Sequence, residues 1–186
     1  GDNQTANLSS LPNTIKEVEA VAANFDPEKS LVIKNGSMSL EEFSAKAAGN
    51  EVIHLATHGV LHPLLPLESA IMLGLTAVPV KDVMTLDLQA NLVTLSACQT
   101  GLGKLYEGDE MVGLTRAFMY AGTPSVLSSL WPVSDESTAM LMSEFTSRFK
   151  AGQTKSQALR QAQIAVRAKY PSPYHWASFI LTGDWK

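Results

Sequence analysis

The chain has 186 residues, the length of one ordinary domain and enough to bury about two-thirds of its unfolded surface. A hydrophobic content of 45% and a charged content of 17% are typical of folded proteins and exclude a disordered chain. The formal charge is −4 without a run of Lys or Arg, so we expect no nucleic-acid or membrane partner. No stretch has the ~20 consecutive apolar residues that a membrane span needs.

Helix signals come first in chain order. Thr14 and Glu17 have the spacing of a capping box and predict a helix that begins at residue 14. Ser39 with Glu42 predicts a second helix, which ends near residue 49. Three further helices are predicted over residues 108–121, from 134 or 135 to 150, and from 154 to the proline at 171.

Short apolar runs predict the strands that lie between these helices. They occupy residues 31–33, 52–57, 70–73, 91–97, 125–131 and 176–181. Because helices and strands alternate, we expect an α/β fold with three layers: a mostly parallel sheet with helices on both faces. Residues 1–10 are polar and are expected to be disordered or foreign to the domain, which then spans 11–186. Since the chain does not begin with Met, we expect a fragment of a longer protein.

Two of the predicted strands end in reactive residues. One ends at His58, and the other at Cys98, the chain's single cysteine. The carboxyl ends of strands in an open α/β sheet gather ligands and catalytic groups, and neighbouring strands lie about 4.8 Å apart. A nearby imidazole can take the proton of a thiol and later protonate a leaving amine. We therefore interpret His58 and Cys98 as the catalytic dyad of a cysteine nucleophile.

Gly59 follows the histidine directly. Without a Cβ, its backbone N–H can approach a substrate carbonyl closely. Together with the N–H of Cys98 it is a candidate oxyanion hole, in which each donor contributes a few kcal/mol. No cofactor is required by this chemistry, and none is expected. A lone cysteine forms no internal disulfide, so the fold needs no oxidising compartment and a cytoplasmic location is expected.

Six ordered segments resemble the CHAT family of caspase-like cysteine peptidases. They are residues 11–19 (LPNTIKEVE), 52–59 (VIHLATHG), 95–101 (LSACQTG), 113–118 (GLTRAF), 129–135 (SLWPVSD) and 174–179 (YHWASF). The resemblance implies a caspase/separase-type fold and a dyad at His58 and Cys98. It also implies frequent fusion to tetratricopeptide (TPR) repeats. The expected function is a cysteine endopeptidase that cleaves protein or peptide substrates through an acyl-enzyme, regulated by a fused or partner module.

Two residues are candidates for substrate binding. In caspase-like relatives the residue two before the cysteine lines the pocket for the substrate's P1 side chain, which implies this role for Ser96. Asp135 follows the next strand end and offers a carboxylate for a P1 Lys or Arg. The alternative for Asp135 is that it serves as the N-cap of the following helix.

Two alternatives stand beside the peptidase. His54, His58 and His62 are spaced by four residues, as metal ligands on a helix would be. On a strand, four residues span about 13 Å, so we expect no metal site and interpret His54 as a hydrogen-bonded core histidine. The second alternative is a catalytically silent scaffold or interaction domain that keeps the caspase-like fold.

Overall fold

The computed structural model describes residues 14–34, 36–60, 62, 65–96, 98–99, 109–131 and 134–186, the side chains at 66, 98, 99 and 109–112 excepted. A mostly parallel sheet forms its centre, in the strand order β1-β5-β7-β8. Strands β1 (Val52–Leu55), β5 (Leu92–Leu95) and β7 (Ser125–Ser129) are parallel, and β8 (Phe179–Gly183) pairs antiparallel with β7. All residues of β5 and β7 are buried, as strands covered on both faces should be. The prediction for residues 1–10 lies outside the described residues.

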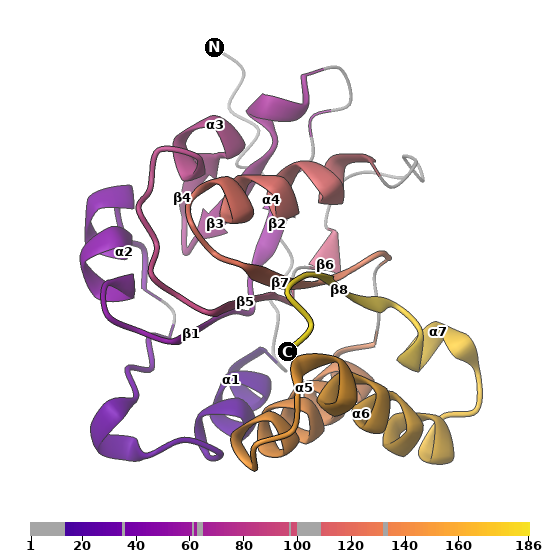
Figure 1. Ribbon diagram of the computed structural model, residues 1–186. Coiled ribbons are helices and arrows are strands. Elements are labelled where there is room, and N and C mark those ends of the chain that lie inside the picture. The colour runs from indigo at the N-terminus through magenta and orange to yellow at the C-terminus, as the bar shows by residue number, and fades with distance from the viewer. Residues whose placement is uncertain are drawn as a thin grey trace.

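Helices cover both faces of this sheet, which confirms the predicted three-layer α/β architecture (Figure 1). One face carries α2 (Leu40–Ala47), α3 (Val80–Val83) and α4 (Asp109–Tyr120). The other carries α1 (Thr14–Ala22), α5 (Asp135–Lys150) and α6 (Lys155–Lys169).

Alternation along β5 divides the apolar core in two. Val93 and Leu95 point into the core under α2, α3 and α4, whereas Leu92 points into the core under α1, α5 and α6. Thr94 and Ser96, at the same parity as Leu92, are therefore directed toward the face of α1 and α5. This alternation decides which helices lie next to each polar side chain of the strand.

A second, smaller sheet lies beyond the carboxyl ends of β1 and β5. Its strand order is β4-β3-β2-β6, formed by β4 (Thr76–Pro79), β3 (Ala70–Leu73), β2 (His58–Val60) and β6 (Cys98–Gln99). Strands β3 and β4 form a hairpin that turns at Gly74, where φ is +69° and a Cβ would lie 2.5 Å from the Gly36 carbonyl oxygen. Only glycine fits this turn.

The predicted strands 52–57, 91–97 and 125–131 end two residues earlier than expected, at Leu55, Leu95 and Ser129. Two other predictions differ more. Residues 31–33 form no strand: Leu31 is 59% exposed, and the segment follows a short 3-10 helix, η1 (Pro27–Lys29). An apolar run becomes a strand only when a partner satisfies its backbone, and among the described residues no strand pairs with it. The last strand begins at Phe179 rather than 176, because Trp176 ends a helical turn, α7 (Pro173–Trp176). A second 3-10 helix, η2 (Pro66–Glu68), precedes β3.

Candidate active site

The parallel pairing of β1 with β5 continues into β2 and β6 at the same offset. Leu55 pairs with Leu95, and His58 pairs with Cys98, so partners differ by 40 in number on both sides of the break. Between the two ladders the Ser96 N–H donates to the Leu55 carbonyl at 2.9 Å. The two segments are therefore adjacent, as expected, and His58 and Cys98 are direct register partners. We call this pair the His58–Cys98 rung.

Strand β3 holds His58 in place. The Thr57 hydroxyl donates to the Met72 carbonyl at 2.6 Å, and Gly59 pairs antiparallel with Ile71. His58 itself is 9% exposed. Because β3 is buried along its whole length, it gives the histidine a rigid support at the carboxyl edge of the main sheet.

The structure locates Cys98 and Gly59 by their backbones. Cys98 opens β6, and its side chain lies outside the described part of the chain. Gly59 is buried in the middle of the second sheet, with Ile71 as register partner on one side and Gln99 on the other. The two candidate oxyanion donors thus lie on adjacent strands.

The two candidate substrate residues come after two neighbouring parallel strands, Ser96 after β5 and Asp135 after β7. Ser96 is 6% exposed and directly follows β5. Asp135 is the first residue of α5 and is partly exposed, while Ser134 occupies the N-cap position without a side-chain cap bond. The interpretation of Asp135 as the N-cap is therefore wrong, and its carboxylate lies in the first turn, where the helix dipole favours negative charge.

Glu136, the residue after Asp135, forms an ion pair at the surface with Lys169. Glu136 Oε1 lies 3.1 Å from Lys169 Nζ, which joins the start of α5 to the end of α6. Tyr170 and the Lys169 ammonium hold the pKa of the Glu136 carboxyl below its ordinary value. The same Tyr170, together with Glu136, raises the pKa of Lys169. Since both side chains are largely exposed, this pair contributes little to stability.

One buried polar cluster was not predicted. Glu17 is 4% exposed, and its Oε1 lies 3.1 Å from His54 Nε2 without hydrogen-bond alignment. His54 Nδ1 in turn forms a short hydrogen bond with the hydroxyl of Thr94. The interpretation of His54 as a hydrogen-bonded core histidine is confirmed. The interpretation of Glu17 as the capping partner of Thr14 is wrong, because α1 already begins at Thr14. In the sequence, the one sign of this buried cluster is a glutamate on an otherwise apolar helix face.

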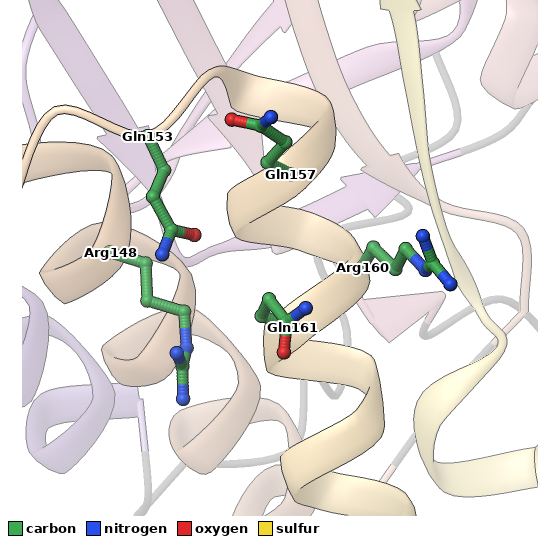
Figure 2. Close-up of a pocket in the computed structure, with 5 residues that line it drawn as sticks. All are labelled: Arg148, Gln153, Gln157, Arg160 and Gln161. Atoms are coloured by element: carbon green, nitrogen blue, oxygen red, sulfur yellow. The ribbon is translucent and has the colours of Figure 1, made fainter.

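A surface pocket lies elsewhere. It has a volume of about 470 Å³ and lies between α5 and α6, where Figure 2 shows polar side chains from both helices. Its lining residues are Arg148, Gln153, Gln157, Arg160 and Gln161. Helix α5 starts near the carboxyl end of β7 and runs away from it, so its last turn marks the opposite edge of the sheet. This pocket is separate from the His58–Cys98 rung.

In the part of the chain that the structure describes, no three His, Cys, Asp or Glu side chains are grouped so that they could hold a metal ion. Within the same residues, no helix combines the length and the apolar character needed to cross a membrane.

Comparisons with known proteins place the chain in a family. The family model for the CHAT domain matches residues 1–184. Tetratricopeptide repeat protein 28 of Homo sapiens is 38% identical over 105 residues, and its Mus musculus counterpart is 36% identical over 105 residues. Each alignment covers 55% of this chain and 4% of the relative, so the chain corresponds to a small part of these proteins. The family match and the caspase-like α/β architecture agree, and the chain belongs to the CHAT-domain family.

Proposed function

We propose that this domain is a caspase-like cysteine endopeptidase. The observation that carries the proposal is the register pairing of His58 with Cys98 beyond the carboxyl ends of two adjacent parallel strands. A thiol needs a base close by, because its ordinary pKa of about 8.5 leaves little thiolate at neutral pH. The pairing of His58 and Cys98 as register partners on adjacent strands supports such a placement.

In the proposed reaction Cys98 transfers its thiol proton to the His58 imidazole, and the sulfur attacks the carbonyl carbon of the substrate peptide. The tetrahedral intermediate collapses as the C–N bond breaks, and the imidazolium gives its proton to the leaving amine. A thioester remains on Cys98. Water, deprotonated by His58, then hydrolyses this acyl-enzyme, which releases a carboxylic acid and restores the thiol.

The negative oxygen of each tetrahedral intermediate requires hydrogen-bond donors. The amides of Gly59 and Cys98 are the proposed donors, since both belong to the two strands that meet at the rung. Gly59 is an internal residue of its sheet, so its N–H is directed toward a neighbouring strand rather than toward solvent. We therefore expect substrate to displace one of these neighbours locally when it binds.

The domain's setting in a longer protein is also a proposal. Its relatives bear the name of a tetratricopeptide repeat protein and are much longer than this chain. We propose that TPR repeats accompany this domain, that they or a partner control access to Cys98, and that the protein acts in the cytoplasm on protein or peptide substrates.

Labelling with an electrophilic peptide tests the peptidase proposal. A peptidyl acyloxymethyl ketone should modify Cys98, and His58→Ala should abolish the reaction because the thiol loses its base. His62→Asn is the matched control: His62 Nδ1 accepts from the Leu65 N–H at 3.0 Å, and an asparagine oxygen can take over that role. Intact-protein mass spectrometry measures the modification, and circular dichroism checks that each variant is folded.

The result decides between the two classes of function. Modification that is lost in His58→Ala and kept in His62→Asn supports the peptidase. A Cys98 that stays inert, both in this domain and in the full-length protein, would contradict it and favour the silent interaction domain.

A further inference from the structure

A line of three buried polar side chains connects α1 to the two strands that lead to the proposed dyad. Glu17 extends from α1, His54 from β1 and Thr94 from β5. The side chains of Glu17 and His54 are 6% and 9% exposed, and Thr94 is completely buried. The contacts run from Glu17 Oε1 to His54 Nε2 at 3.1 Å and from His54 Nδ1 to the Thr94 hydroxyl.

A buried carboxylate beside an imidazole is costly to maintain. Removing both groups from water costs several kcal/mol per ion when they are charged, so apolar side chains would serve stability at least as well. The turn that follows α1 is also anchored to α5, since the Asn24 side-chain amide donates to Thr146 Oγ1 at 2.8 Å and to the Ser143 carbonyl at 3.1 Å. Attachment of α1 alone therefore does not account for the cluster.

The position of the cluster along the strands supplies another account. His54 and Thr94 are register partners in the same ladder whose continuation pairs His58 with Cys98. Between these two rungs, the described residues form the Leu55–Leu95 pair and the backbone bond from Ser96 to Leu55. Among the described residues, the hydrogen bond from His54 to Thr94 is the side-chain link between β1 and β5 that lies nearest the gap between the β1–β5 and β2–β6 ladders.

We propose that Glu17 and His54 are positioning residues for the His58–Cys98 rung. Glu17, on the helix that covers this face of the sheet, holds the imidazole of His54 in one orientation, and His54 in turn holds Thr94. Strands β1 and β5 are thereby kept in one register where they leave the main sheet. A shift of about 1 Å between reacting groups can cost two orders of magnitude in rate, so a device that prevents sliding near the break matters for catalysis. This inference rests on the proposed peptidase function for its catalytic consequence.

Matched substitutions test the proposal. Thr94→Val and Glu17→Gln each remove one link of the line at nearly constant volume, and Thr94→Ser restores the hydroxyl. Thr115→Val is the control, because Thr115 is also a buried threonine, its hydroxyl lies 3.3 Å from Ser128 Oγ, and it lies on the opposite face of the sheet.

Two measurements are made on each folded variant. The first is the rate of Cys98 labelling by the peptidyl probe as a function of pH. The second is amide hydrogen exchange in β2, compared with exchange in β7. We expect Thr94→Val and Glu17→Gln to slow labelling at least tenfold and to accelerate exchange in β2 alone. Thr94→Ser and Thr115→Val should stay within about threefold of the original protein in both.

The exchange measurement keeps this inference separate from the peptidase proposal. If Cys98 is inert in the unsubstituted protein, the peptidase proposal fails, while exchange in β2 still decides the positioning role. Equal exchange in Thr94→Val and Thr115→Val overturns the positioning role. With a reactive Cys98, equal labelling rates in these two variants overturn it as well.

Discussion

Among single residues, Asp135 is our proposed determinant of the side chain that a substrate presents next to the scissile bond. It begins α5, and the preceding strand β7 is the parallel neighbour of the strand that leads to Cys98. Asp135 is partly exposed, whereas Ser96 is buried. A carboxylate at this edge fits the amine or guanidinium of a P1 Lys or Arg.

This assignment predicts a change in substrate preference. Asp135→Asn should lower the labelling of Cys98 by probes with P1 Lys or Arg about tenfold relative to probes with P1 Leu, because it removes one charge-assisted contact. Glu136→Gln is the matched control, since Glu136 is the next residue and already pairs with Lys169. An unchanged Lys-to-Leu ratio in Asp135→Asn, measured by competitive labelling, would exclude Asp135 from the P1 pocket.

At the scale of elements, local signals predicted helix starts well where no tertiary contact competes. The capping box of Ser39 with Glu42 forms as predicted, and the helix predicted from residue 154 begins with a capping box of Thr154 with Gln157. The same pattern at Thr14 fails, because Glu17 instead faces His54 in the core. A capping box is a property of four residues, whereas the burial of Glu17 depends on a strand more than thirty residues away along the chain.

This contrast gives a prediction about two threonines with the same sequence signature. Thr154→Ala should lower the free energy of unfolding by about 1 kcal/mol, because Thr154 Oγ1 accepts from the Gln157 N–H. Thr14→Ala should change it by less than about 0.5 kcal/mol, since Thr14 lies within the first turn and accepts no capping bond from the described residues. Urea unfolding of the two variants provides the comparison, and equal costs would show that Thr14 is a cap after all.

Strand predictions succeeded where burial on both faces leaves a continuous apolar run. β5 and β7 are such strands, and the ends that carry Ser96 and Ser129 were predicted within two residues. The second sheet was not predicted as a unit, because β2 and β6 have three and two residues and no periodicity. Residues 31–33 illustrate the converse error, since apolar residues without a pairing strand remain exposed. The proximity of residues 58 and 98 was predictable because the positions of strand ends follow from apolar runs, whereas the line from Glu17 to Thr94 required the fold.

At the scale of the whole molecule, one sheet joins two apolar cores. Phe118 on α4 belongs to the core that contains Leu95 and Val126, and Phe145 on α5 belongs to the core that contains Leu92 and Leu127. Both phenylalanines are almost completely buried. Because β5 and β7 contribute side chains to both cores, neither layer of helices can lose its packing without exposing the strands that support the other.

The domain should therefore unfold as a single cooperative unit. Phe118→Leu and Phe145→Leu should each lower the free energy of unfolding by about 1–2 kcal/mol, less than the ~3–5 kcal/mol of a change to alanine. Since the two side chains lie on opposite faces, the double variant should lose the sum within about 0.5 kcal/mol. Denaturant unfolding followed by far-UV circular dichroism and by tryptophan fluorescence should give coincident midpoints in all variants. If the circular dichroism and fluorescence midpoints of a variant differ, the two helix layers unfold independently. The His58–Cys98 rung would then depend on only one helix layer.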